Sequence, residues 1–149
     1  MNDPKVFISY SWTTQAHQEL VKHWADRLIA DGIEVILDIY DLKEGDDKYY
    51  FMESMITDPT VTHVLVVCDN AYAQKADMRK AGVGTESQII SSEIYQKVKQ
   101  SKFIPIVCDF NNEEPTLPTF MKSRIWINFS SSEAENENWE QVRLLMASL

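Results

Sequence analysis

Basic residues are scarce in this sequence, and the scarcity limits the ligands that it can attract. Lys and Arg number 14 against 23 Asp and Glu, so the formal charge at pH 7 is −9. A strong negative charge repels nucleic-acid phosphates and anionic lipid, so we expect no nucleic-acid partner and no membrane-surface role. The hydrophobic content of 44% predicts a packed core, and the length of 149 residues predicts a single domain, 1–149.

Long hydrophobic runs are also lacking. No apolar stretch approaches the ~20 residues that a membrane-spanning helix needs. The cluster at residues 64–68 has only the length of a strand. Residues 1–4 lack the basic start and the apolar run of a signal peptide. We therefore expect a cytoplasmic protein without a membrane partner.

Cysteine is rare, and several catalytic motifs are missing. Cys68 and Cys108 each end an apolar run, which predicts buried free thiols. There is no G-x-G-x-x-G fingerprint and no G-x-x-x-x-G-K-[ST] loop, so a dinucleotide-dependent redox enzyme and a P-loop NTPase are not indicated. A G-x-S-x-G elbow is absent as well. His17, His23 and His63 lack the spacing of metal ligands and fall outside the expected crevice loops, which predicts structural histidines and no metal site.

Apolar, β-prone runs alternate with amphipathic segments along the whole chain. Pro105 cannot donate to a sheet and places its strand toward an edge or a bulge. Thr85 and Gln88 fit a capping box, so we expect the third helix to begin near Glu86. The expected strands are 5–9, 33–37, 61–68, 103–108 and 125–128. The expected helices are 14–31, 47–57, 86–98 and 139–149, and the expected loops are 38–47 and 69–84, with a surface turn at 130–137.

This alternation predicts an α/β fold with a parallel sheet covered by helices on both faces. In such a sheet, the loops that follow the strands gather at one edge and form a crevice for ligands. We expect the loops 9–14, 38–47 and 69–84 to share that crevice. A candidate site must therefore draw its residues from these three loops.

Three separated motifs carry a resemblance to a known family. They are residues 6–12 (VFISYSW), residues 35–42 (VILDIYDL) continuing to Gly45-Asp46-Asp47, and residues 82–86 (GVGTE) ahead of 92–95 (SEIY). Together they resemble a bacterial SEFIR domain, a relative of Toll/interleukin-1 receptor (TIR) domains. The resemblance implies a flavodoxin-like, five-stranded parallel sheet. It also implies an interaction loop equivalent to the BB loop of such domains, which comprises Asp41, Leu42, Lys43, Glu44, Gly45, Asp46 and Asp47.

The resemblance implies two classes of function. One is an NAD⁺ glycohydrolase that acts in bacterial anti-phage defence after self-assembly, with NAD⁺ as substrate and no cofactor. The other is a non-enzymatic adaptor that associates with its own kind or with other SEFIR or TIR domains. In TIR hydrolases the essential carboxylate is a glutamate on the third helix, which implies Glu86 here and Glu93 as the alternative. These hydrolases commonly carry a tryptophan shortly before that glutamate, and this helix has none.

Other residues of the expected crevice are candidates for substrate binding. An acid in a first helical turn also complements the helix dipole, so the dipole alone would explain Glu86. A nucleotide binder without catalysis remains a third possibility. Arg79 and Lys80 would bind a pyrophosphate or the acidic interaction loop of a neighbouring molecule. The remaining candidates are Ser9, Tyr10, Ser11, Trp12, Asp38 and Tyr50.

Overall fold

The computed structural model describes residues 4–78, 89–98 and 100–147. Its strands are β1 (Lys5–Ser9), β2 (Glu34–Ile36), β3 (His63–Cys68), β4 (Phe103–Val107), β5 (Phe110–Asn111), β6 (Glu114–Pro115) and β7 (Ile127–Asn128). Its α-helices are α1 (Gln15–Ala30), α2 (Asp38–Asp41), α3 (Lys48–Thr57), α4 (Asn70–Met78), α5 (Ser92–Lys97) and α6 (Ser132–Ala147). Two 3₁₀ turns, η1 (Gln100–Lys102) and η2 (Thr119–Met121), complete the described elements.

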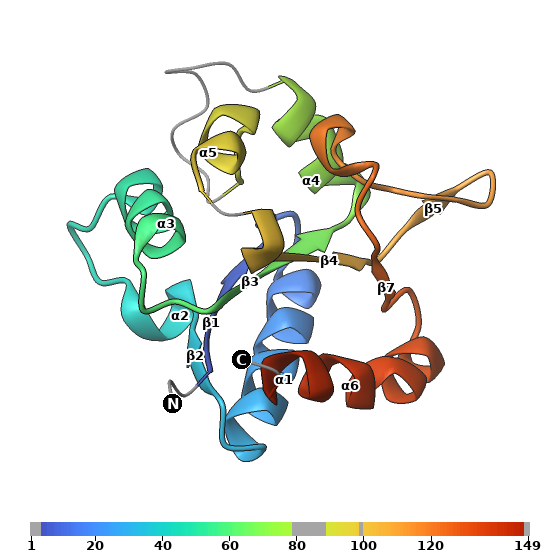
Figure 1. Ribbon diagram of the computed structural model, residues 1–149, viewed down its shortest axis with the longest axis horizontal. Coiled ribbons are helices and arrows are strands. Elements are labelled where there is room, and N and C mark those ends of the chain that lie inside the picture. The colour runs from blue at the N-terminus through green and yellow to red at the C-terminus, as the bar shows by residue number, and fades with distance from the viewer. Residues whose placement is uncertain (1–3, 79–88, 99, 148–149) are drawn as a thin grey trace.

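Five of the strands form one parallel sheet in the order β2-β1-β3-β4-β7 (Figure 1). The chain order reverses between β1 and β3, where Val6 lies opposite His63 in the register. This is the flavodoxin-like arrangement, in which ligands bind beyond the carboxyl ends of the strands beside the reversal. The predicted fold class is confirmed.

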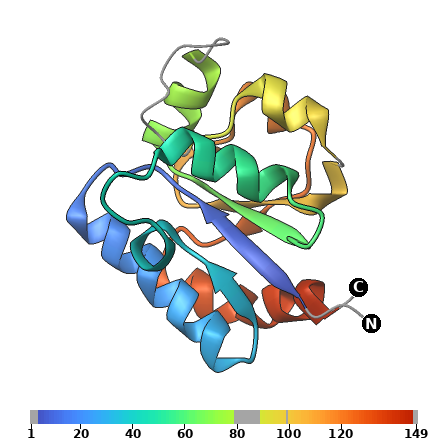
Figure 2. The ribbon, with the colours of Figure 1, turned by 90° about the vertical axis from the view of Figure 1, so that its left-hand side faces the viewer.

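Helices cover both faces of the sheet (Figure 2). Helices α1 and α6 pack on one face, and α3, α4 and α5 pack on the other. All six residues of β3 are buried, because a central parallel strand has helices on both sides. The start of β1 and the end of α6 lie at the same side of the sheet, by the amino ends of the strands (Figure 2). Among the described residues, no helix is both long and apolar enough to cross a membrane.

Helix α1 follows its sequence signals closely. The Thr14 side chain accepts a hydrogen bond from the His17 amide, and Val21, Trp24 and Leu28 face the core. Gly32 follows the helix with a φ of +87°, a backbone conformation that other residues adopt at a cost. The predicted helix 14–31 is confirmed within one residue at each end.

The segment 38–47, expected to be a loop, begins with the short helix α2. The Leu37 amide donates to Asp41 Oδ2, and the Asp41 amide donates to Leu37 O, each at 2.9 Å. The Tyr40 hydroxyl donates to Asp26 of α1. Because a single turn of helix is marginal on its own, these tertiary contacts explain a helix that propensity did not predict.

The segment 69–84, also expected to be a loop, contains helix α4. Asp69 Oδ1 accepts from the Tyr72 amide at 2.8 Å and caps the helix, while Tyr72, Ala73 and Ala76 are buried. Because these are the few apolar positions in an otherwise polar segment, the helical spacing of apolar residues was too weak to predict a helix. The aspartate directly after a buried strand is the signal that could have found it.

Two further helix boundaries differ from expectation. The third predicted helix, expected to begin near Glu86, is α5 and begins at Ser92, because Ser91 is the cap that accepts from the Ile94 amide. Thr85 lies outside the described residues. The expected turn at 130–137 is instead the first part of α6, where Ser131 caps the Ala134 amide.

Pro105 was predicted to place its strand at an edge of the sheet or at a bulge, and the prediction of an edge strand is wrong. Strand β4 lies between β3 and β7, and Pro105 is opposite Val66 in the register with β3. Strand β7 pairs only with Ile106 and Val107. The proline is tolerated because β7 begins beyond it, which leaves no ladder partner on that side.

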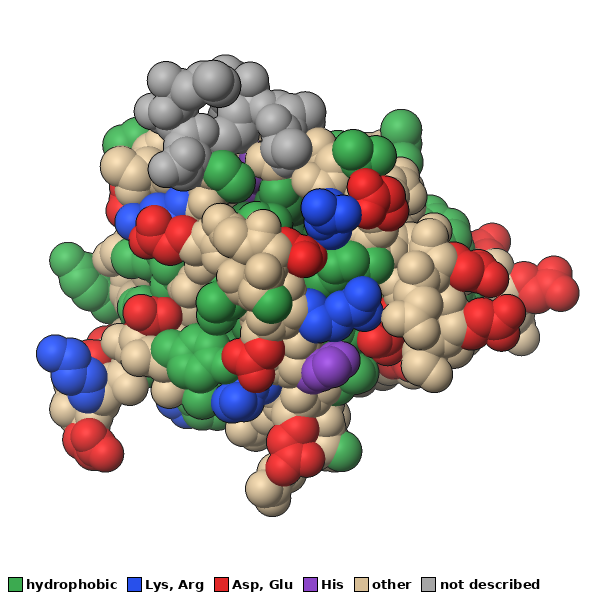
Figure 3. All heavy atoms as spheres, turned by 90° about the horizontal axis from the view of Figure 1, so that it is seen from below, with side chains coloured by type: hydrophobic (Ala, Val, Ile, Leu, Met, Phe, Trp, Pro, Cys, Tyr) green, Lys and Arg blue, Asp and Glu red, His purple; other side chains and the backbone are tan. Residues whose placement is uncertain are grey.

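A small hairpin of β5 and β6 projects from the body of the domain (Figure 1). Asn112 and Glu113 at its tip have φ values of +49° and +69°, as a tight two-residue turn requires. Acidic side chains gather toward this end of the molecule in the view onto the face covered by α1 and α6 (Figure 3). Negative charge is therefore unevenly spread over this face.

Candidate functional site

Residues that follow β1 and β3 meet at the carboxyl edge of the sheet, by which we mean the surface formed where the five strands end. The Ser11 hydroxyl donates to both carboxylate oxygens of Asp69, at 3.0 and 2.9 Å. Both side chains are nearly inaccessible to solvent. This contact lies at the point where the order of the strands reverses, which is the expected place for a crevice.

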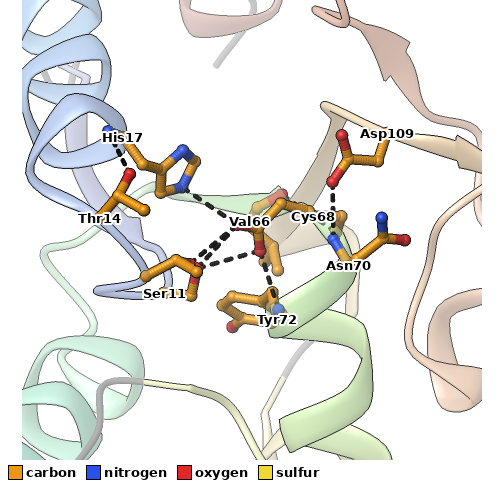
Figure 4. A network of polar contacts seen from close by, with 10 residues as sticks. Ser11, Thr14, His17, Val66, Cys68, Asn70, Tyr72 and Asp109 are labelled. Atoms are coloured by element: carbon orange, nitrogen blue, oxygen red, sulfur yellow. Dashed lines mark hydrogen bonds and ion pairs between the residues drawn. The ribbon is translucent and has the colours of Figure 1, made fainter.

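Asp69 organises the polar network at this edge (Figure 4). It also accepts from the Thr13 hydroxyl at 3.1 Å and from the Tyr72 amide at 2.8 Å. Figure 4 shows the labelled Ser11 and His17 side chains pointing toward the same place, from the loop after β1 and from α1, and both lie within reach of Asp69. Because it accepts these hydrogen bonds, Asp69 holds the loop after β1 against the start of α4. The sequence analysis did not identify Asp69 as a site residue.

His17 lies on α1, outside the crevice loops as expected, but its side chain reaches the carboxyl edge. Its Nε2 is 3.7 Å from Asp69 Oδ2, and 12% of the side chain is exposed. His63, at the other end of the sheet, shares a hydrogen bond of 2.8 Å with the Thr62 hydroxyl. Burial lowers the pKa of His63, so this ring is neutral at pH 7.

Tyr10 and Asp38 come from the ends of β1 and β2 and are both buried. Burial, with a smaller contribution from the charge of Asp38, raises the pKa of Tyr10 well above its ordinary value. The Tyr10 hydroxyl is therefore neutral at pH 7. Of the predicted substrate-binding residues, Ser9, Tyr10, Ser11 and Asp38 thus lie beneath the surface, and direct contact with a substrate stays a prediction for them.

A chain of hydrogen bonds links the end of β1 to the start of α5. Ser9 Oγ and the Tyr72 hydroxyl are 2.7 Å apart, and the Ile90 amide donates to the same hydroxyl at 3.1 Å. Glu93, three residues further on, is exposed in the first turn of α5. The alternative glutamate of the sequence analysis is therefore accessible to solvent, and its place in a substrate site stays a prediction. The first candidate, Glu86, lies outside the described residues, as do Arg79 and Lys80.

Aromatic side chains are accessible on the same edge. Trp12 is 37% exposed and Tyr50 is 66% exposed. The Lys48 ammonium lies over the Trp12 ring, with Nζ 3.4 Å from the ring centroid. Trp12 lies in the loop that follows β1, and Lys48 is the first residue of α3. Their contact therefore joins the end of β1 to the start of α3.

The predicted interaction loop, 41–47, is a structured turn. Lys43 and Asp46 close it, because the Lys43 amide donates to Asp46 Oδ2 and the Asp46 amide donates to Lys43 O. Gly45 has a φ of +92°, and Asp47 caps α3 by accepting from the Tyr50 amide. All of its residues except the half-buried Leu42 are exposed. The loop therefore presents a row of carboxylates to solvent.

Two hollows lie at opposite ends of the sheet, the first at the carboxyl edge and the second at the amino ends of the strands. A pocket of about 500 Å³ between α1 and α6 includes three carboxylates, Asp69, Asp109 and Glu135. A groove of about 760 Å³ lies at the amino ends of β4 and β7, with Arg124 at its base and Ile125 89% exposed at its rim. Its described lining contains no acidic residue and consists of Tyr95, Gln96, Ser101, Phe103, Ile104, Phe120, Ser123, Arg124, Ile125, Ile127, Gln141 and Leu145.

Two expected absences concern metals and disulfides. Within the described ranges, no group of three histidine, cysteine or acidic side chains is placed to hold a metal ion. Cys68 is buried and Cys108 half-buried, and both are free, as predicted. Burial raises the pKa of both thiols, which makes them poor nucleophiles.

The sheet order and the helices on both faces define a flavodoxin-like α/β domain. The SEFIR domain model matches residues 4–141, so the chain belongs to the SEFIR family. It is similar to the crystal structure of a prokaryotic SEFIR domain, at 41% identity and a TM-score of 0.87, over 97% of this chain and 92% of that one.

A more distant similarity supports the fold alone. The TIR domain of the Toll-related receptor TRR-2 from Hydra magnipapillata is 14% identical, with a TM-score of 0.62 over 96% of this chain and 98% of that one. A comparison with curated proteins gives no match.

Proposed function

We propose that this SEFIR domain is an NAD⁺ glycohydrolase and that Glu93 is its essential carboxylate. The observation that carries the proposal is the position of Glu93, exposed in the first turn of α5, three residues after Ile90, whose amide is tied to the end of β1 through Tyr72. Asp38 and Asp69 belong to the carboxyl edge, but both are buried. Glu93 is more exposed than either of these carboxylates and is therefore freer to approach a ribose. Glu86 remains the alternative.

The reaction needs little more than one carboxylate. Water adds to C1′ of the ribose while the bond from C1′ to the nicotinamide nitrogen breaks, giving ADP-ribose, nicotinamide and a proton. Nicotinamide leaves as a neutral ring because the bonding electrons neutralise its positive charge, so no general acid has to protonate it. A carboxylate beside the ribose stabilises the positive charge that develops as the bond breaks. As an anti-phage effector, the domain would act by depleting the NAD⁺ of its cell.

Charge places the substrate on one side of the edge. The pocket between α1 and α6 carries Asp69, Asp109 and Glu135, which would repel the phosphates of a dinucleotide. The side toward α3 and α5 carries Lys48, Trp12 and Glu93, which offer a cation, a flat ring and a carboxylate. We therefore assign the substrate to the α3 and α5 side.

The test is release of nicotinamide from NAD⁺ by the purified domain at high concentration. Glu93→Gln should abolish release, because it removes the charge and keeps the shape. Glu133→Gln is the matched control, since Glu133 is also an exposed glutamate in the first turn of a helix. Release that survives Glu93→Gln but not Glu86→Gln would transfer the role to Glu86. Release that survives both substitutions would contradict the mechanism.

The second candidate function is homotypic assembly without chemistry, and one observation favours it. The 41–47 loop is exposed and acidic at the carboxyl edge, whereas the groove at the opposite edge is apolar, free of acids and based on Arg124. Leu42 and its flanking carboxylates complement such a groove on a second copy. This contact would be head-to-tail, which generates open filaments unless the rotation closes a ring. Self-association would then accompany hydrolysis or replace it.

A further inference from the structure

Building on the proposed function, we propose that Lys48 and Trp12 form the position that binds the dinucleotide, with Trp12 stacking on one of its bases and Lys48 pairing with a phosphate. Trp12 was already a candidate for substrate binding from the sequence. Lys48 was assigned no role there, and it joins the site only because the fold brings α3 to the exit of β1.

The exposure of Trp12 is the first observation. The residues before it, Tyr10 and Ser11, are at most 1% exposed, whereas Trp12 is 37% exposed. The backbone beneath Trp12 is firmly held, because Ser11 and Thr13 on either side of it both bond to Asp69. The indole is therefore a fixed aromatic surface, and a purine or nicotinamide ring can stack on it without ordering a loop.

The charge of Lys48 is the second observation. It lies 3.4 Å from the centroid of the Trp12 ring, and no carboxylate within the described ranges forms an ion pair with it. The neighbouring Asp47 carboxylate is occupied in capping α3. A cation beside an aromatic face, without a paired carboxylate, can accept an anionic ligand without first breaking a salt bridge.

Together the two groups match the chemistry of NAD⁺, which joins flat bases to a pyrophosphate. The flexible stem of Lys48 allows its ammonium to move from the indole face to a phosphate when a base takes its place on the ring. Neither group touches the bond that breaks. Both should therefore lower KM rather than raise kcat, because they bind the ground state and the transition state alike.

The test is binding of ADP-ribose, a product that this reaction cannot consume, to the full chain by isothermal titration calorimetry. Lys48→Met should weaken binding about tenfold, the loss of one charge-assisted contact. It should also reduce the dependence of binding on salt. Lys48→Arg should bind nearly as well as wild type, and Trp12→Ala should weaken binding by a similar factor.

Lys22→Met is the matched control, because Lys22 also lies over an aromatic ring, that of Tyr40, at 5.7 Å, and should leave binding unchanged. Circular dichroism checks that each variant is folded. Equal ADP-ribose binding by wild type and Lys48→Met, or no binding by wild type, would overturn the inference.

The outcomes also separate this inference from the proposed function. If NAD⁺ is not hydrolysed but Lys48→Met weakens ADP-ribose binding, the nucleotide site stands and the hydrolase proposal fails. If hydrolysis depends on Glu93 but KM for NAD⁺ is the same in Lys48→Met and Trp12→Ala, the hydrolase proposal stands and this inference fails.

Discussion

Ser11 and Asp69 are 58 residues apart in the sequence, yet the Ser11 hydroxyl donates to both carboxylate oxygens of Asp69 at 3.0 and 2.9 Å. The contact joins the exit of β1 to the start of α4. It thereby holds the loop that carries Trp12 against the strand end beside it. The stability of the candidate site depends on this one carboxylate more than on any predicted catalytic residue.

Replacement of Asp69 by alanine should therefore destabilise the domain. The Tyr72 amide loses its helix cap and the buried Ser11 hydroxyl loses its acceptor, so we expect a loss of about 2–4 kcal/mol in the free energy of unfolding. Asp69→Asn keeps an acceptor and should lose less. Urea denaturation measures both, with the exposed Glu137→Ala as control. Equal stability of Asp69→Ala and wild type would contradict the role given to this carboxylate.

The stability of the domain should fall as the pH drops from about 7.5 to 5.5. Burial lowers the pKa of His63 in the folded state, so the unfolded chain binds more protons in this range. The stabilisation is complete above the ordinary histidine pKa and is lost as the pH falls through it. Thermal denaturation of wild type and His63→Gln across this range tests the assignment. The variant should show a flatter dependence, and an equally steep one would assign the effect to another group.

Gly45→Ala should strain the 41–47 loop without creating a clash. An added Cβ at Gly45 meets no atom within 4 Å, but the φ of +92° disfavours any side chain. We expect a loss of about 1 kcal/mol in the free energy of unfolding. Gly45→Asn should cost less, because asparagine tolerates positive φ better. Chemical denaturation compares the two, and an alanine variant as stable as wild type would show that the turn relaxes freely.

Substitutions at opposite edges of the sheet should interfere with head-to-tail assembly. Glu44→Lys reverses a charge in the exposed loop, and Ile125→Asp places a charge at the rim of the groove. Each variant alone should remain monomeric at concentrations at which the wild type assembles, as measured by analytical ultracentrifugation. Ile29→Asp, at an exposed site on α1 outside the groove, is the control.

A mixture of the two variants makes the assembly test sharper. Each Glu44→Lys molecule keeps an intact groove, and each Ile125→Asp molecule keeps an intact loop. One good interface can then form between them, so the mixture should yield dimers and no filaments. Filaments from either variant alone would exclude this loop and this groove as the two sides of the contact.

If self-association activates hydrolysis, NAD⁺ consumption should rise more steeply than linearly with protein concentration. Glu44→Lys and Ile125→Asp should remove that steepness and leave Glu93 in place. Initial rates of nicotinamide release across micromolar concentrations provide the measurement. A strictly linear dependence in the wild type would separate catalysis from assembly.

Local sequence pattern was sufficient for the sheet and for α1. The apolar runs at 5–9, 61–68 and 103–108 mark strands, and the spacing of Val21, Trp24 and Leu28 marks the buried side of a helix. These features report how one segment of backbone is buried. Buried positions recur with the residue spacing of the helix or strand. They can therefore be predicted without knowing which other elements pack against the segment.

Helix α4 and the start of α5 could not be read in the same way. Helix α4 buries Tyr72, Ala73 and Ala76 in an otherwise polar segment. Ile89 and Ile90, which resemble a helical pair, are buried in the extended segment before Ser92. In both places contacts with the sheet outweigh local propensity.

The sequence by itself determined the family, the alternation of strands and helices, and the edge of the sheet at which a site would form. Only the tertiary structure decided which polar and aromatic groups meet there, including Asp69 with Ser11 and Lys48 with Trp12. The reason is physical. Periodicity records the environment of one segment, whereas an encounter between distant side chains depends on the order and register of the strands, which no single segment contains.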